Sequence, residues 1–144
     1  MLSNTSKYAI RAAIYLAINV KDSQKIGIKK ISEDLNIPSP FLGKILQSLA
    51  KHKLLTSTKG PNGGFGLAKD ANDITLYEIV QIIDGNDLFD RCLISLRTCN
   101  EHRVPCPVHN SYEGIRKEIY TLFKNQTIGK LATSATQADQ EIFL

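Results

Sequence analysis

The sequence predicts a mostly helical protein with one small β-hairpin and a separate helix near the C-terminus. Three observations lead to this prediction. Apolar residues recur at helical spacing in five segments, two short strand-like pieces flank a glycine-rich turn, and a polar stretch with all three cysteines precedes the last long helix. With 144 residues, of which 42% are hydrophobic and 22% charged, the chain has the size of one domain plus an appendage.

The first helix is expected over residues 3–19. Hydroxyl and amide side chains at positions 3–5 can cap its start, and apolar residues then recur every three or four positions. A second, shorter helix is expected over residues 26–35, where one side is apolar and the other is charged. Asn36 suits a left-handed C-terminal cap, which would end this helix.

A third helix is predicted to start near Pro40, with Ser39 as the N-cap and the proline in the first turn, where a missing N–H costs little. Two amphipathic helices joined by so short a turn form a helix-turn-helix, whose second helix enters the major groove of DNA. The pattern alone leaves an ordinary helical hairpin equally open. The apolar stripe of the third helix is Leu42, Ile45, Leu46 and Leu49, and its outward face is Gly43, Lys44, Gln47 and Lys51.

Two short strands are predicted over residues 54–58 and 65–67, around a glycine-rich tip that runs from Lys59 to Gly64. A helix-turn-helix followed by such a hairpin is a winged helix. Lys59 on a tip of small residues lets backbone N–H groups and one charge approach a phosphate or the minor groove. A nucleotide-binding phosphate loop is disfavoured, because the GxxxxGK[ST] order is missing and no helix opens directly after the segment.

A fourth helix is expected over residues 73–84, with Thr75 and Glu78 as a capping box and Gly85 at its end. A later amphipathic helix over residues 112–123 needs a surface to pack against. We expect a second copy of the chain, with folding back on its own domain as the alternative. The expected organisation is a winged helix-turn-helix over 1–85, a cysteine loop over 86–110, a dimerisation helix over 111–131 and a flexible tail over 132–144.

The basic residues gather in the first half of the chain. Residues 1–70 hold 11 Lys and Arg against 4 Asp and Glu, whereas the remainder holds 7 against 10. A positive half favours a polyanion such as DNA, although a solvated lysine-rich surface explains the same numbers. No apolar run approaches the roughly 20 residues of a membrane span and no secretory signal opens the chain, so we expect a cytoplasmic protein without a membrane partner.

All three cysteines fall within residues 92–106, which indicates shared chemistry. Three thiolates and the imidazole of His109 can bind tetrahedral zinc or an iron–sulfur cluster. The cluster is favoured, because the tight C-x(2–4)-C spacing of structural zinc sites is missing, and zinc stays the alternative. A catalytic cysteine is disfavoured, because no oxyanion-forming segment or substrate pocket accompanies the thiols.

On these residues the chain resembles the Rrf-type family of bacterial winged-helix transcription regulators, with its IscR-like and NsrR-like branches. The resemblance runs from position 6 to position 131. Its sharpest markers are Ile31-Ser32-Glu33, Leu54-Leu55, the tip Lys59-Gly60-Pro61-Asn62-Gly63-Gly64-Phe65, and the loop Arg91-Cys92, Cys99 and Cys106-Pro107-Val108-His109.

This resemblance implies a homodimer that binds a palindromic operator in double-stranded DNA, mostly as a repressor and not as an enzyme. The third helix would lie in the major groove and the hairpin at the minor groove. The positions that would contact DNA are Ser39, Pro40, Phe41, Lys44, Gln47 and Lys51 in the helix and Lys59 and Gly60 at the hairpin tip.

The resemblance also implies a sensor of iron–sulfur, redox or nitric oxide status. Cys92, Cys99, Cys106 and His109 match the three-cysteine, one-histidine pattern of the IscR-like branch, so [2Fe-2S] is favoured over [4Fe-4S]. The cysteine gaps are each one residue longer than in that branch, and Leu93, Ile94 and Leu96 replace glycine-rich linkers. Some relatives lack the cluster, so a zinc-stabilised or cluster-free regulator, or a protein-binding adaptor, is the alternative.

Overall fold

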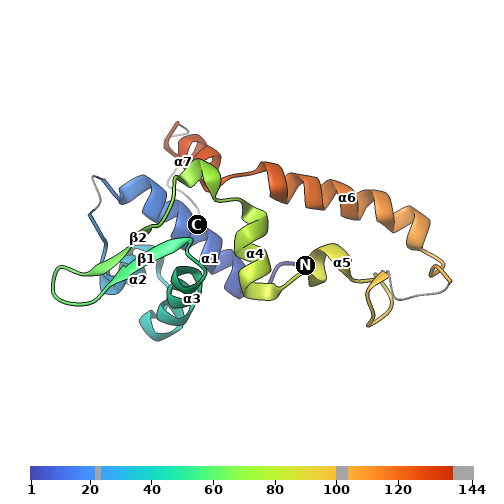
Figure 1. The fold of residues 1–144 in the computed structure, drawn as a ribbon, viewed down its shortest axis with the longest axis horizontal. Helices are drawn as coiled ribbons and strands as arrows, with labels where there is room; N and C mark the ends of the chain where they lie inside the picture. Colours follow the sequence, from blue (N-terminus) through green and yellow to red (C-terminus); the bar gives the residue numbers. More distant parts are fainter. Residues whose placement is uncertain (22–23, 100–103, 138–144) are drawn as a thin grey trace.

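The computed structural model describes residues 1–21, 24–99 and 104–137. Figure 1 shows the N-terminal helices and the hairpin gathered at one end, while α6 extends beside α4 and α5 toward the other end. The predicted class, mostly helical with one small hairpin, is confirmed. The elements are α1 (Asn4–Asn19), α2 (Ile28–Leu35), α3 (Ser39–Lys51), β1 (Leu55–Thr58), β2 (Gly64–Leu67), η1 (Ala71–Asp73), α4 (Leu76–Asp84), α5 (Asp87–Asp90), α6 (His109–Asn125) and α7 (Ile128–Gln137).

The turn between α2 and α3 follows the predicted chemistry with one correction. Asn36 adopts the left-handed conformation, with φ 54° and ψ 46°, and so ends α2. Ser39 is not the N-cap of α3, because the carbonyl of Pro38 already accepts the N–H of Leu42 at 2.9 Å. The helix therefore starts one residue early, with Ser39 inside its first turn.

The start of α2 also differs from the prediction, because Ile26 belongs to the hairpin. Its N–H donates to the carbonyl of Phe65 at 2.9 Å, and its carbonyl accepts the N–H of Phe65 at 2.8 Å. Gly64 permits this pairing, since a Cβ at that position would lie 2.3 Å from the Ile26 carbonyl oxygen, and its φ is 145°. The hairpin of β1 and β2, called the wing below, is thus tied to the segment before α2.

The main core joins α1, α2, α3 and α4 and includes α7. Ile128 is fully buried in this core, and its N–H donates to the carbonyl of Ile74 at 2.8 Å. The tail expected from residue 132 is instead helical through Gln137, because α7 packs against α1. The last expected tail positions, 138–144, lie outside the described residues.

A second, smaller core joins α4, α5 and α6 around Val80, Phe89 and Phe123. The ring of Phe89 lies 5.0 Å from that of Tyr77 and 5.5 Å from that of Phe123. The short helix α5 is therefore fixed to both of its neighbours. No helix in the described part of the chain combines the length and the apolar character needed to cross a bilayer.

Candidate nucleic-acid interface and cysteine loop

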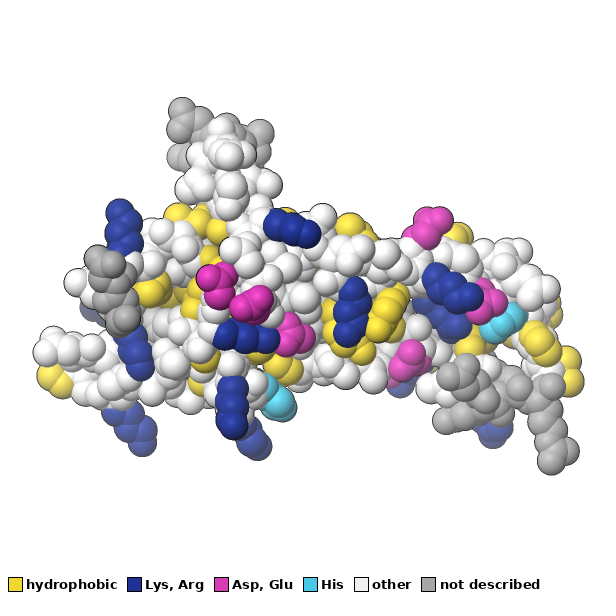
Figure 2. Space-filling view, turned by 45° about the horizontal axis from the view of Figure 1, so that its top comes forward, with side chains coloured by type: hydrophobic (Ala, Val, Ile, Leu, Met, Phe, Trp, Pro, Cys, Tyr) yellow, Lys and Arg dark blue, Asp and Glu magenta, His cyan; other side chains and the backbone are white. Residues whose placement is uncertain are grey.

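The outward face of α3 and the tip of the wing form one exposed surface. Most of the residues predicted to contact DNA are solvent-exposed there, and Ser39 is half-buried. Figure 2 shows Lys and Arg side chains without Asp or Glu on the left part of the face in view, the end of the molecule at which Figure 1 places the wing. The exposed predicted residues are Pro40, Phe41, Lys44, Gln47, Lys51, Lys59 and Gly60.

Phe41 has a second task that the sequence did not indicate. Its ring meets the ring of Tyr8 edge to face, with 5.7 Å between the centroids. The guanidinium of Arg11 lies over the Tyr8 ring, 5.6 Å from its centroid. Because Phe41 is 38% exposed, it both packs α3 against α1 and contributes to the surface. Tyr8 was missed because the contact joins positions far apart in the chain.

A hollow of about 360 Å³ separates the wing from the start of α2. Lys29, Gln47 and Lys59 line it, so that lysines from α2 and the wing face the same space. The amide of Gln47 donates to Ser57 Oγ at 3.4 Å, which links α3 to β1. Lys29 was not singled out from the sequence, although its place on the charged side of the second helix was the available signal.

Lys25, which precedes α2, also holds the wing in place. Lys25 Nζ donates to Thr58 Oγ1 of β1, next to the paired residue Ile26. This hydrogen bond lies at the end of β1 that leads into the glycine-rich tip. The orientation of the wing therefore depends on the chain before α2 as well as on β1 and β2.

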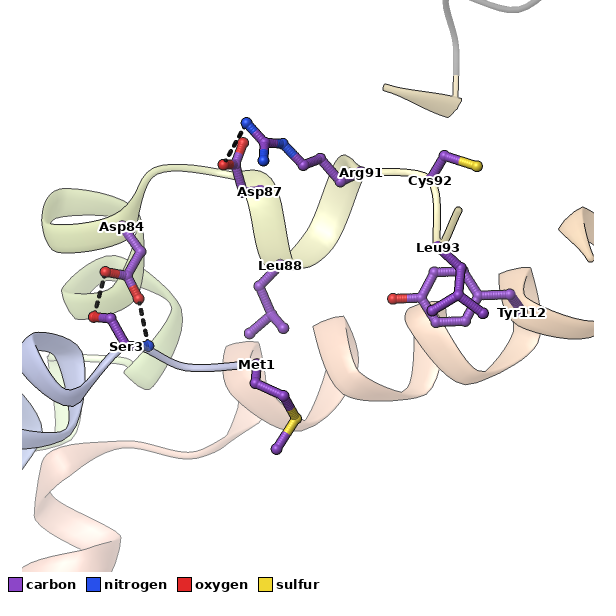
Figure 3. Close-up of a pocket in the computed structure, with 9 residues that line it drawn as sticks. All are labelled: Met1, Ser3, Asp84, Asp87, Leu88, Arg91, Cys92, Leu93 and Tyr112. Carbon is purple, nitrogen blue, oxygen red and sulfur yellow. Dashed lines mark hydrogen bonds and ion pairs between the residues drawn. The ribbon is translucent and has the colours of Figure 1, made fainter. Parts of the chain in front are cut away.

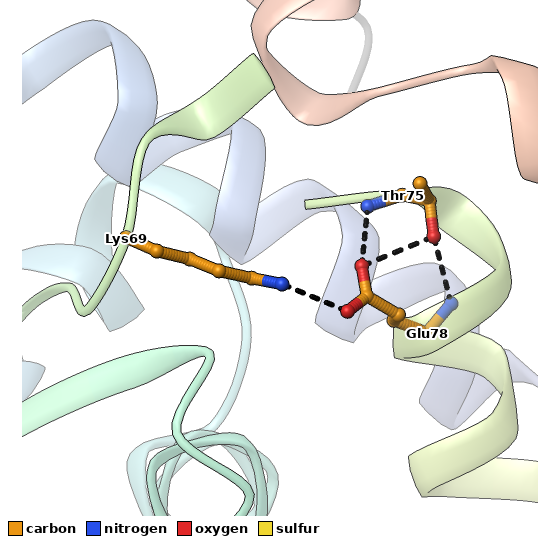
Figure 4. Close-up of polar contacts among 3 residues, drawn as sticks. All are labelled: Lys69, Thr75 and Glu78. Atoms are coloured by element: carbon orange, nitrogen blue, oxygen red, sulfur yellow. Dashed lines mark hydrogen bonds and ion pairs between the residues drawn. The ribbon is translucent and has the colours of Figure 1, made fainter. Parts of the chain in front are cut away.

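The capping box of α4 lies where the wing leads back into the core (Figure 4). Glu78 N donates to Thr75 Oγ1 at 3.2 Å, and Thr75 N donates to Glu78 Oε2 at 2.9 Å. Lys69 Nζ lies 2.8 Å from Glu78 Oε1. Burial opposes ionisation of Glu78, but the hydrogen bonds and charge of Lys69 and the bonds from Thr75 outweigh it and lower the pKa of this carboxyl.

The cysteine loop brings two of the predicted ligands together. Cys92 Sγ and Cys106 Sγ lie 3.3 Å apart, and Cys92 is 6% exposed. A backbone bond from Cys92 N to the carbonyl of Arg97, at 3.2 Å, closes the turn that follows α5. Cys99 lies at the end of that turn and is half-buried.

The two neighbouring thiols are not equivalent. The backbone N–H of Ile94 and then the Cys106 thiol hydrogen-bond to Cys92 and lower its pKa, with a smaller effect of the same sign from Cys99. The hydrogen bond to Cys92, together with burial, raises the pKa of Cys106. Cys92 is therefore the first of the pair to become a thiolate, the form that binds metal.

His109 begins α6, and its backbone N–H donates to the carbonyl of Cys106 at 2.9 Å. Its ring Nε2 faces Glu113 Oε2 at 3.6 Å instead of joining the sulfurs. Among the described residues, no three His, Cys, Asp or Glu side chains converge closely enough to hold one metal ion.

The donor set fits an iron–sulfur cluster in its chemistry. Cys92, Cys99 and Cys106 would supply thiolates, which are the ligands that such clusters take, and histidine replaces cysteine in some iron–sulfur proteins. A cluster holds more than one iron and so does not require four side chains to meet at one point, unlike a structural zinc ion.

A cavity of about 480 Å³ lies between the N-terminus, α5 and α6, beside the cysteine loop (Figure 3). Ser3 N and Oγ both donate to the carboxylate of Asp84, at 3.1 and 2.5 Å. Burial opposes the ionisation of Asp84, but these bonds outweigh it and lower its pKa. On the other side, Arg91 pairs with Asp87 at 2.9 Å.

Comparison with known proteins decides the family. A family model described as an iron-dependent transcriptional regulator, Rrf2, matches residues 2–134. The chain belongs to the Rrf2 family. As a member of it, the protein is a transcription regulator and not an enzyme.

Individual relatives agree with the Rrf2 assignment. A protein of Aquifex aeolicus, provisionally described as an HTH-type transcriptional regulator, is 35% identical over 91% of this chain and 90% of its own length. The regulator IscR of Photobacterium profundum is 28% identical over 90% of this chain and 74% of its own length. The structure of CymR, the global cysteine regulator of B. subtilis, has the same fold, with a TM-score of 0.76 at 19% identity over 93% of this chain and 97% of its own.

Proposed function

We propose that this Rrf2-family regulator binds a palindromic operator as a homodimer in the cytoplasm and represses transcription in response to an iron–sulfur cluster. The observation that carries the DNA-binding part is the shared surface of α3 and the wing, where Lys44, Lys51 and Lys59 are all exposed. An exposed helix with a basic, polar face beside a lysine-bearing hairpin suits the major groove and the adjacent narrow groove.

Within α3, three exposed residues are proposed to read bases. Pro40, Lys44 and Gln47 follow i, i+4, i+7 spacing and therefore share one face of the helix. A lysine can donate to guanine and a glutamine can pair with adenine. Lys59 and Gly60 are proposed to contact the sugar–phosphate backbone at the minor groove, where affinity depends on charge and not on sequence.

The homodimer is proposed to form through α6. Ile115 and Leu122 lie seven positions apart on one edge of this helix and are 55% and 52% exposed, beside the buried Phe123. Two apolar side chains in line on a helix that leads away from the main core are the pattern expected for contact with a second copy. Tyr120 lies on the other side of the helix, where its ring packs against Tyr77 and Phe89.

Cys92, Cys99, Cys106 and His109 are proposed to hold the cluster, with [2Fe-2S] favoured over [4Fe-4S] and zinc as the lesser alternative. When bound, such a cluster makes the state of the loop depend on iron supply and on oxidants. The similarity to IscR and the thiol-rich donor set support this assignment. His109 has to turn from Glu113 to join the ligands.

The fold offers a path from this loop to the DNA-binding surface. The loop continues directly from α5, whose Phe89 is 5% exposed between Tyr77 of α4 and Phe123 of α6. Helix α4 in turn packs against α3. Ordering of the loop is therefore proposed to shift α5, and with it the relative positions of the two α3 helices in the dimer, which must be about 34 Å apart to meet successive major grooves.

The deciding experiment is purification without oxygen, followed by a visible spectrum and iron, sulfide and zinc analysis. We expect a coloured protein that contains iron and sulfide. A colourless protein loaded with zinc would remove the sensor proposal and leave DNA binding untouched. The DNA-binding part is tested by measuring the affinity for a random duplex at increasing salt concentration. A protein that binds phosphates should lose affinity steeply as salt rises, whereas a protein-binding adaptor should not.

A further inference from the structure

We propose that Cys92 and Cys106 form a reversible disulfide when no cluster is bound, so that the loop has an oxidised state of its own. The two sulfurs lie 3.3 Å apart. A disulfide bond is about 2.05 Å long, so the sulfurs need to approach by little more than about 1 Å. The proposal rests on the proposed function in one respect only, namely that the same thiols serve as cluster ligands.

The backbone on both sides holds the two sulfurs in this position. Cys92 follows α5 and lies in a turn that is closed by the bond to Arg97 and by the pairing of Arg91 with Thr98. In Figure 3 its sulfur points away from Ser3 and Asp84 and out of the cavity beside the loop.

Cys106 is fixed from the other end of the loop. It lies between Pro105 and Pro107, whose rings restrict the backbone, and its carbonyl accepts the N–H of His109 at the start of α6. The short distance between the sulfurs therefore joins two anchored segments, one held by α5 and the other by α6.

The chemistry requires an oxidant, for which we take hydrogen peroxide. One thiolate of the pair attacks a peroxide oxygen, the O–O bond breaks, and hydroxide leaves and is protonated to water. The second thiolate then attacks the resulting sulfenic acid at sulfur. An S–S bond forms, the S–O bond breaks and a second water leaves, so that two thiols and one hydrogen peroxide give one disulfide and two waters.

Such a disulfide would separate two causes of cluster loss. A loop emptied by iron shortage keeps its thiols and can be refilled when iron returns. An oxidised loop has two of its four proposed ligands in the S–S bond and must be reduced by a thiol first. The regulator would thus stay in its cluster-free form for as long as oxidising conditions last.

The sequence makes this proposal easy to test in the full chain. Trypsin cleavage after Arg91, Arg97, Arg103 and Arg116 puts each cysteine in its own peptide, covering residues 92–97, 98–103 and 104–116. Chelator-treated protein is exposed to hydrogen peroxide, alkylated, digested and analysed by mass spectrometry without reductant. We expect peptide 92–97 joined to peptide 104–116. The thiols of Cys92 and Cys106 should be lost in each chain, and no link should form between chains.

Matched variants separate this proposal from cluster binding. Cys99→Ser should form the same link although a proposed ligand is missing, whereas Cys106→Ser should not form it. Three outcomes would overturn the proposed disulfide. They are links that involve peptide 98–103 equally often, links between chains, and oxidation of Cys92 by added oxygen without any link. A protein that forms the link but never takes up iron would contradict only the proposed function. A protein that takes up iron but whose cluster-free form keeps its thiols after peroxide treatment would contradict only the proposed disulfide.

In wild-type protein the oxidised sample should regain the visible spectrum of the cluster after incubation with iron and sulfide only when dithiothreitol is added first. The chelator-treated sample that never met peroxide serves as the control, and its cluster should return to the same extent with or without that pretreatment. Equal recovery of the oxidised sample in both conditions would contradict the proposal.

Discussion

At the level of single residues, Lys59 and Lys44 are proposed to serve different parts of DNA recognition. Lys59 lies at the exposed tip of the wing, where it is proposed to contact phosphate at the minor groove. Lys59→Ala should weaken binding to operator and random duplex by the same factor and reduce the slope of log K against log salt by about 0.9. A salt titration on both duplexes measures this, with Lys130→Ala on α7 as the control that removes one charge away from the interface.

Lys44 lies on the exposed face of α3, the helix that is proposed to enter the major groove. Lys44→Ala should change discrimination at a single base pair by about 1–3 kcal/mol, because a lysine that donates to one base edge carries sequence information. Affinities for a panel of single-base operator variants would reveal the position. A uniform loss over the whole panel would instead assign Lys44 to phosphate contact.

Among the helices and strands, α4 depends on its capping box. Glu78→Ala removes an acceptor for Thr75 N and the partner of Lys69, and we expect the free energy of unfolding at pH 7 to fall by about 1 kcal/mol. Urea denaturation measures the change. The side chains of Lys69 and Glu78 are each 35% exposed, so the ion pair itself should contribute little.

The same carboxyl gives a prediction for pH. Because the folded-state pKa of Glu78 lies below its usual value of 4.5, its charge stabilises the fold above about that pH, and the effect is lost as the pH falls through the folded-state value. Glu78→Gln should therefore be less stable than wild type at pH 7 but approach it in acid. A stability difference between the two that stays constant down to pH 3 would contradict this reasoning.

The sequence predicted those features of the helices and strands that depend on residues close together in the chain. The Thr75–Glu78 capping box, the left-handed Asn36 and the glycine-rich wing were predicted from local chemistry and are confirmed. The pairing of Ile26 with Phe65 joins segments distant in the chain, so no local pattern could reveal it. Pro38 in place of Ser39 as N-cap shows the usual uncertainty of one residue at a helix end.

For the whole molecule, the exposed edge of α6 predicts the oligomeric state. Ile115→Lys combined with Leu122→Lys should convert the proposed dimer into a monomer and weaken operator binding, because two charges would enter the proposed contact between copies. Analytical ultracentrifugation measures the mass, and far-UV circular dichroism checks that α6 is intact. The exposed polar position Thr121→Lys provides the control, and a double variant that remains dimeric would require a different interface.

Long-range packing also limited what could be predicted of the candidate site. The exposed positions of α3 followed from periodicity, since an amphipathic helix buries one stripe and presents the other, and those of the wing followed from its glycine-rich tip. The sulfur contact between Cys92 and Cys106 and the turn of His109 toward Glu113 depend on how α5 and α6 pack, which spacing alone cannot supply.

The burial of Ile128 means that the DNA-binding region is completed by the end of the chain. A fragment that stops at Gly85 would lose this side chain and the Ile128 N–H that pairs with the Ile74 carbonyl, leaving a gap over α1. The proposed cluster-binding loop and the surface of α3 and the wing therefore cannot be exchanged between relatives as two independent segments divided at Gly85. A functional chimaera has to transplant α7 together with the helices it covers.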